Sequence, residues 1–130
     1  MILVDTHIVA WLAFSPEELS ARAKEAIDQA RTDGEPLAIS DITLLELTVL
    51  VTKGRIHLDI SLETFLREIE ARFVVLPINS RVCVQTLQLP ASYPKDPADR
   101  IIGALAQTEG LALITADQKI RRSKTIRTIW

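Results

Sequence analysis

Met1-Ile-Leu-Val-Asp5 opens the chain, and Leu111-Ala-Leu-Ile-Thr-Ala-Asp117 repeats its pattern of a short apolar run followed by an aspartate. Ile2–Val4 is apolar on both faces, which is typical of a strand buried inside a parallel sheet. Open parallel sheets bind ligands beyond the carboxyl ends of their strands. The two runs therefore predict that Asp5 and Asp117 face one pocket.

Amphipathic helical patterns separate these runs from further apolar ones. Besides Ile2–Val4, strands are expected at Leu37–Ile39, Phe73–Leu76, Leu111–Thr115 and, as an edge strand, Ile126–Trp130. Helices are expected over Thr6–Phe14, from Ser15-Pro16 to about Thr32, from Ser40 or Asp41 to Lys53, over Leu62–Arg72 after Ser61, from about Ser80 to Leu89, over Pro97–Glu109, and for one turn after Asp117. Strands separated by helices pair in parallel through right-handed crossovers. We predict an α/β fold, a three-layer α/β/α sandwich with a mostly parallel sheet of about five strands, in a single domain over residues 1–130.

The composition is that of a globular protein, with 48% apolar and 25% charged residues. Cys83 is the single cysteine, so no intramolecular disulfide can form and a reducing cytoplasm is the expected location. The longest apolar run, Ile8–Phe14, is too short to span a bilayer, and the first residues lack the basic segment of a signal peptide. Gln118–Trp130 holds five basic residues and no acid, which fits either nucleic-acid contact or a solvated surface.

Glu46 lies inside an apolar helical pattern. Its neighbours three and four residues away are Ile42, Thr43, Val49 and Leu50, so no local salt bridge is available to it. Burial of an unpaired charge is costly, and the carboxylate therefore needs a tertiary partner or a metal. The alternative is a glutamate at the edge of the apolar stripe that reaches solvent.

The segment Asp96-Pro-Ala-Asp-Arg100 has the composition of a helix start. Asp96 is a good N-cap, Pro97 suits the first helical position, and Asp99 is favoured by the helix dipole. Capping is the better explanation for Asp96, whereas Asp99 can also project toward whatever the helix end faces. Arg100 opposes the dipole, so we expect it to pair with an acid or to contact a phosphate.

One site can explain four acids: Asp5, Glu46, Asp99 and Asp117. Carboxylates about 5 Å apart repel by roughly 3 kcal/mol per pair at an effective dielectric near 20, so a cluster needs protons or a cation. Oxygen ligands without a Cys or His cluster select Mg²⁺ or Mn²⁺, and such sites are suited to phosphoryl transfer.

Thr6 and Thr115 flank the two acids at the strand ends. Their hydroxyls can orient the carboxylates. Capping of the first helix by Thr6 and the β propensity of Thr115 explain the two residues equally well.

In order and spacing, the polar segments resemble the PIN-domain ribonucleases of the VapC toxin type. These segments are Val4-Asp5-Thr6, Glu46, Asp96–Arg100 and Thr115-Ala-Asp117. The resemblance covers nearly the whole chain and implies metal-dependent endonucleolytic cleavage of RNA. It also implies a cognate antitoxin protein and a homodimer. The residues that it assigns to catalysis and metal binding are Asp5, Glu46, Asp99 and Asp117. Thr6 and Asp96 are auxiliary residues, and we add Thr115 to them as a further auxiliary residue.

RNA phosphates are expected to contact basic side chains, namely Arg100, Lys119, Arg121 and Arg122. The loop Pro90–Lys95 is expected to influence the choice of substrate. Two other functions stay open. A Mg²⁺-dependent phosphatase or phosphoacceptor domain also places an aspartate after the first strand, although His7 stands where an aspartyl-phosphate phosphatase has its second aspartate. A non-catalytic module would use the acidic pocket to bind a partner's basic side chain.

Overall fold

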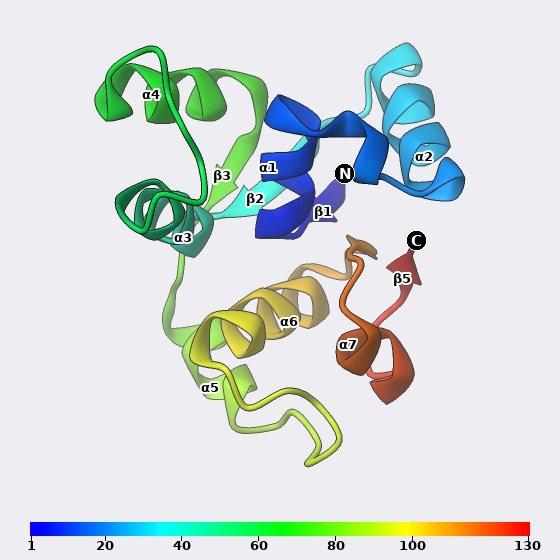
Figure 1. Ribbon diagram of the computed structural model, residues 1–130. Helices are drawn as coiled ribbons and strands as arrows, with labels where there is room; N and C mark the ends of the chain where they lie inside the picture. Colours follow the sequence, from blue (N-terminus) through cyan, green and yellow to red (C-terminus); the bar gives the residue numbers. More distant parts are fainter.

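The computed structural model describes residues 1–130 and contains a five-stranded, wholly parallel sheet (Figure 1). The strands are β1 (Ile2–Val4), β2 (Leu37–Ser40), β3 (Val74–Leu76), β4 (Leu113–Ile114) and β5 (Thr128–Ile129). Their order in the sheet is β3-β2-β1-β4-β5. The direction of winding reverses between β1 and β4, and this switch point is where open α/β sheets form their ligand crevices.

Seven α-helices and one short 3₁₀ helix connect the strands. They are α1 (Thr6–Phe14), η1 (Pro16–Glu18), α2 (Ala21–Thr32), α3 (Asp41–Thr52), α4 (Leu62–Arg72), α5 (Ser80–Thr86), α6 (Pro97–Glu109) and α7 (Gln118–Ser123). None of these helices has both the length and the apolar character that a membrane crossing requires. The predicted α/β architecture with about five strands is confirmed.

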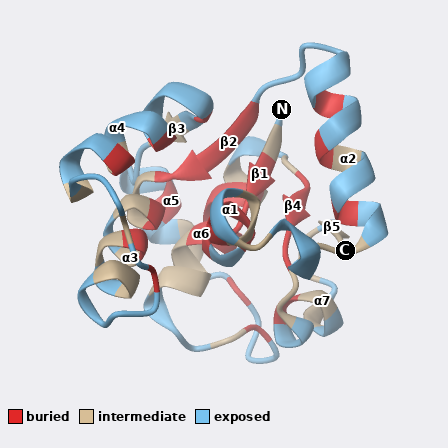
Figure 2. Cartoon of the chain, turned by 45° about the horizontal axis from the view of Figure 1, so that its top comes forward, coloured by how far each residue is buried: buried red, intermediate tan, exposed pale blue.

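Successive strand residues face opposite helical layers, as the pleat of a strand requires. One core cluster joins residues of α1 to α4 to the strand residues Val4, Leu37, Ile39 and Ile114. The other joins residues of α5, α6 and α7 to the strand residues Leu3, Ala38 and Leu113. Figure 2 shows the buried residues concentrated in the central strands and on the inward sides of the helices. The sheet is therefore the middle of three layers.

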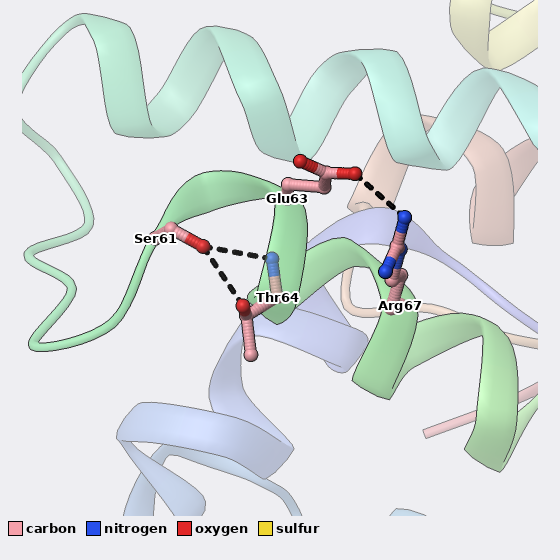
Figure 3. Close-up of polar contacts among 4 residues, drawn as sticks. All are labelled: Ser61, Glu63, Thr64 and Arg67. Atoms are coloured by element: carbon pink, nitrogen blue, oxygen red, sulfur yellow. Dashed lines mark hydrogen bonds and ion pairs between the residues drawn. The ribbon is translucent and has the colours of Figure 1, made fainter.

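Local capping chemistry starts α4 where the sequence predicts it. The Ser61 hydroxyl oxygen accepts a hydrogen bond from the backbone N–H of Thr64 at 3.1 Å and donates to the Thr64 hydroxyl at 2.8 Å (Figure 3). Glu63 and Arg67 form an exposed ion pair of 2.7 Å in the same turn. The cap contributes about 1 kcal/mol, whereas the exposed pair contributes at most a few tenths.

Two predicted helix starts differ from the structure. The helix expected from Ser15-Pro16 to Thr32 is divided, because Ser20 caps α2 by accepting a hydrogen bond from the N–H of Ala23 at 3.1 Å. Asp5 caps α1 in place of Thr6, which is the first helical residue. Further predicted elements are shorter in the structure, among them those at Phe73–Leu76, Ser80–Leu89, Leu111–Thr115 and Ile126–Trp130.

Candidate active site

The four predicted acids line one cavity beyond the carboxyl ends of β1 and β4. The cavity measures about 340 Å³, and its lining includes Asp5, Glu46, Asp96, Asp99 and Asp117 together with His7, Trp11 and Ala116. Asp5 directly follows β1, Glu46 lies in α3, Asp96 and Asp99 lie at the start of α6, and Asp117 follows β4. The sheet's switch point therefore gathers carboxylates that are far apart in the sequence.

Asp5 is the buried member of this cavity, with 7% of its surface exposed. Its carboxylate accepts hydrogen bonds from the backbone N–H of Thr6 at 2.9 Å and from the Thr115 hydroxyl at 2.7 Å. The same hydroxyl oxygen accepts a hydrogen bond from the N–H of Asp117 at 3.1 Å. Burial raises the pKa of Asp5 against the opposing effect of the Thr115 and Thr6 hydrogen bonds. Thr115 thus joins the two acids at the strand ends.

Glu46 has a tertiary partner inside the protein. The Thr6 hydroxyl donates a hydrogen bond to Glu46 Oε1 at 2.5 Å and lies 3.0 Å from the hydroxyl of Thr43. Burial raises the pKa of Glu46, and the Thr6 hydrogen bond partly offsets that effect. The glutamate is half-buried and lines the acidic cavity, so it does not simply reach solvent.

Burial and neighbouring charges raise the pKa of Asp99 from 3.8 to about 7. Burial is the main cause, followed by the charges of Asp5, Asp96, Asp117 and Glu46. Each of these charges disfavours ionisation of Asp99 because like charges repel across a partly desolvated space. The cavity is therefore crowded enough for its acids to act on one another.

No salt bridge compensates the acids of the cavity. The two ion pairs of the protein are Met1–Glu35 and Arg67–Glu63, and both lie elsewhere. In the present conformation no three His, Cys, Asp or Glu side chains are arranged to hold a metal ion. Asp117 is instead oriented by local capping, since its carboxylate accepts a hydrogen bond from the N–H of Ile120 at 3.0 Å.

The donors nevertheless fit a hard divalent cation. All are carboxylate oxygens, the ligands that Mg²⁺ and Mn²⁺ prefer, and their mutual repulsion is what such a cation would relieve. Asp5 and Asp117 are fixed by hydrogen bonds at the strand ends, whereas Glu46 and Asp99 are half-buried.

A wider groove, named the cationic groove for its lysine and arginine residues, adjoins the acidic cavity and shares Asp96, Asp99 and Asp117 with it. Its three basic side chains therefore stand against three acidic ones. The groove measures about 810 Å³, and its basic lining residues are Lys95, Lys119 and Arg122. Lys119 and Arg122 are among the residues predicted to contact RNA, whereas Lys95 was expected only to affect substrate choice. Arg121 belongs to the same helix, α7, but does not line the groove.

Arg100 forms no ion pair with an acid and has a structural role, whereas its contact with an RNA phosphate stays a prediction. Its guanidinium donates hydrogen bonds to the backbone carbonyls of Thr86 at 2.8 Å, Leu89 at 3.3 Å and Pro94 at 3.2 Å. The planar group offers several donors in a fixed geometry, which suits it to hold separate carbonyls of one loop. Arg100 therefore fixes the loop that carries Lys95.

Tyr93 anchors the same loop against α6. It is 1% exposed, and its hydroxyl donates a hydrogen bond to the backbone carbonyl of Asp99 at 2.9 Å. A Cβ added at Gly103 would clash with the Tyr93 hydroxyl oxygen, so the close approach requires glycine. A glycine inside a helical pattern is the sequence signal that could have indicated this contact.

Comparison with known proteins gives a consistent result for the whole chain. A family model described as PIN domain matches residues 2–125. Ribonuclease VapC22 of Mycobacterium tuberculosis is 34% identical over 131 residues, which cover 99% of this chain and 98% of that protein. The chain therefore belongs to the PIN domain family, and the resemblance inferred from the sequence is confirmed.

Solved structures agree with this fold. A toxin-antitoxin complex from Klebsiella pneumoniae matches with a TM-score of 0.65 and 28% identity over 92% of this chain and 88% of that one. VapBC2 from Rickettsia felis, bound to a DNA fragment from its promoter, matches with a TM-score of 0.75 and 18% identity over 98% of this chain and 97% of that one. The second match extends the likeness in fold to nearly the entire length of both chains.

Proposed function

We propose that this PIN-domain chain is the endoribonuclease toxin of a toxin–antitoxin pair and hydrolyses RNA phosphodiester bonds with Mg²⁺ or Mn²⁺. The observation that carries the proposal is a cavity of uncompensated carboxylates beside a cationic groove. The name of Ribonuclease VapC22, a relative along the whole chain, supports the same chemistry.

The four predicted acids, Asp5, Glu46, Asp99 and Asp117, would hold the cation, with Asp96 as an auxiliary residue. A divalent cation bound by these residues would lower the pKa of an attacking water and stabilise the charge that develops on the phosphate. Oε2 of Glu46 would be free to accept the proton of that water, because Oε1 accepts the hydrogen bond from the Thr6 hydroxyl.

Lys95, Lys119 and Arg122 bind the phosphates of the RNA strand along the groove. Such contacts supply affinity and fix the register of the strand, but they carry little sequence information. They also counter the charge of the acidic cavity, which by itself would repel a polyanion. The proposal includes a cytoplasmic location, which is supported by an RNA substrate and by the reducing compartment that the single Cys83 predicts.

The test is cleavage by the purified, partner-free chain. With Mn²⁺ it should cut tRNA or ribosomal RNA at discrete positions, and EDTA should stop the reaction. Asp5→Asn and Asp99→Asn should each abolish cleavage while circular dichroism shows an intact fold. Asp59→Asn, a change at an exposed acid away from the cavity, is the matched control and should cleave normally. Full activity in either cavity variant would reject the assignment of these acids.

The proposal includes a cognate antitoxin and a homodimer. The acidic cavity suits an arginine or lysine side chain of the antitoxin, which would block the site by charge-assisted hydrogen bonds. The dimer surface would include exposed apolar side chains on α3 and in or next to α5, namely Leu45, Val49, Val84 and Leu87. Light scattering of the partner-free chain measures the dimer, and replacement of Leu87 by Ser should weaken it.

A phosphatase that forms an aspartyl-phosphate finds no support in the geometry of Asp5. The residue is 7% exposed, and hydrogen bonds from Thr6 and Thr115 occupy both carboxylate oxygens. Attack by Asp5 on a phosphorus atom would require one of these oxygens to give up its hydrogen bond, whereas binding of a cation would not, because each carboxylate oxygen has a second lone pair. A non-catalytic module shares the acidic cavity, and cleavage by the partner-free chain separates it from the nuclease.

A further inference from the structure

Both tryptophans of the chain lie together beside the acidic cavity. The ring centroids of Trp11 and Trp130 are 5.9 Å apart at an interplanar angle of 44°. The His7 ring lies 6.2 Å from Trp11 at 58°. Trp11 and His7 also line the cavity that contains the acids. An aromatic surface therefore borders the place where the proposed reaction occurs.

Packing in the core covers only part of the Trp11 side-chain surface. The side chain is half-buried and contacts the core cluster beneath α1 to α4, and Trp130 packs against the same cluster. The remaining surface of Trp11 faces the cavity, next to the exposed His7. Contact with Trp130 restricts the rotation of the Trp11 ring. The result is a supported aromatic surface that is partly open to a ligand.

The cationic groove has no comparable surface. Its aromatic residue is Tyr93, which is 1% exposed and whose hydroxyl is bound to the carbonyl of Asp99. The basic side chains there can hold phosphates, but no ring face is available for a base. The cationic groove and the acidic cavity share Asp96, Asp99 and Asp117. Phosphate-binding and aromatic surfaces thus meet at the same acids.

Resting on the nuclease function proposed above, we propose that Trp11, supported by Trp130 and flanked by His7, is a stacking surface for the base next to the scissile phosphate. Bases in a duplex are already stacked and paired, so only an unpaired nucleotide can place its face on Trp11. Recognition of this kind tolerates any base, because every base has a π face.

Fluorescence of Trp11 tests this directly. Trp130→Phe leaves Trp11 as the single tryptophan, and EDTA prevents cleavage during titration. A short single-stranded RNA should quench the emission, whereas a strand with abasic sites and a duplex of the same sequence should quench it much less. In the wild-type background, Trp11→Ala should lose about tenfold or more in affinity for the intact strand, and Trp11→Phe should retain part of it.

Lys119→Ala is the matched control for a phosphate contact. It should weaken binding of the intact and the abasic strand by the same factor, whereas Trp11→Ala should weaken binding of the intact strand alone. Urea unfolding of each variant identifies loss of fold, and the Trp130→Phe titration needs no change at Trp11. Equal quenching by intact and abasic strands would overturn the stacking surface. The Trp11 ring would then be assigned to a cation–π contact with a basic side chain of a protein partner.

Cleavage of the same strand with Mn²⁺ is measured in parallel on the wild type. Cleavage without base-dependent quenching overturns the stacking surface and leaves the nuclease function in place. Base-dependent quenching without cleavage supports the stacking surface and overturns the nuclease function. The two failures are therefore distinguishable.

Discussion

Replacement of Asp99 by asparagine should stabilise the metal-free protein at pH 8. Asp99 has a folded-state pKa of about 7 against an ordinary 3.8, because burial and four neighbouring carboxylates disfavour its charge. The full difference corresponds to roughly 4 kcal/mol at about 1.36 kcal/mol per pKa unit. Asp99 is partly exposed, and solvent screening reduces this to about 1–2 kcal/mol.

The pH dependence follows from the sign of the shift. The folded state binds the Asp99 proton more tightly than the unfolded state, so the contribution of Asp99 to stability is full below pH 4 and is lost as the pH rises through about 7. Asparagine does not titrate. The gain from Asp99→Asn should therefore be largest at pH 8 and should disappear near pH 4.

Urea unfolding in EDTA at several pH values measures the difference between variant and wild type. At pH 8 the gain corresponds to about 3–8 °C in Tm. Asp59→Asn, at an exposed position, is the control and should change little. Mg²⁺ or Mn²⁺ should reverse the order, because the cation stabilises the wild type and binds the variant less well. A variant no more stable than the wild type at pH 8, or equally stabilised at pH 4 and pH 8, would refute this account.

Three further predictions concern the support of the site. Thr115→Val should cost about 1–3 kcal/mol in urea unfolding and reduce cleavage, since it leaves a buried carboxylate and an N–H without their partner, whereas Thr115→Ser should restore most of both. Gly103→Ala should destabilise the fold by about 1–3 kcal/mol, because its Cβ meets the Tyr93 hydroxyl; unchanged urea midpoints would contradict this contact. Arg100→Lys should expose the preceding loop to limited proteolysis while leaving the salt dependence of RNA binding unchanged, and Lys119→Ala should lower that salt slope by about one; a lower slope in Arg100→Lys would restore the phosphate contact.

The sequence predicts the parts of this fold that depend on local chemistry. Ser61 and Asp96 cap the helices that follow them, and Gly110 ends α6 with a φ of 64°. These features involve neighbouring residues, so their geometry can be inferred without knowledge of the tertiary structure. The meeting of Asp5 and Asp117 is also predictable, because the carboxyl ends of parallel strands share one edge of the sheet.

Contacts between distant segments could not be predicted in this way. Arg100 was expected at an acid or a phosphate because its charge opposes the helix dipole, but three backbone carbonyls of a preceding loop bind it. The pairing of Trp11 with Trp130 joins α1 to the last residue of the chain. Neither contact leaves a periodic pattern or a fixed spacing. The divided helix was within reach, however, since Ser20 is an ordinary N-cap residue.

The carboxylates of the cavity fall into two groups that differ in how they are held. Asp5, Asp96 and Asp117 each cap a helix, so the energy that orients them comes from secondary structure and does not depend on a bound cation. Glu46 and Asp99 cap no helix, and both have raised pKa values. A cation would therefore find fixed ligands at the strand ends and adjust the remaining two, at a small cost in reorganisation. The chain can therefore fold before it binds metal, because Glu46, Asp99 and the buried Asp5 all have raised pKa values and can take up protons in the absence of a cation.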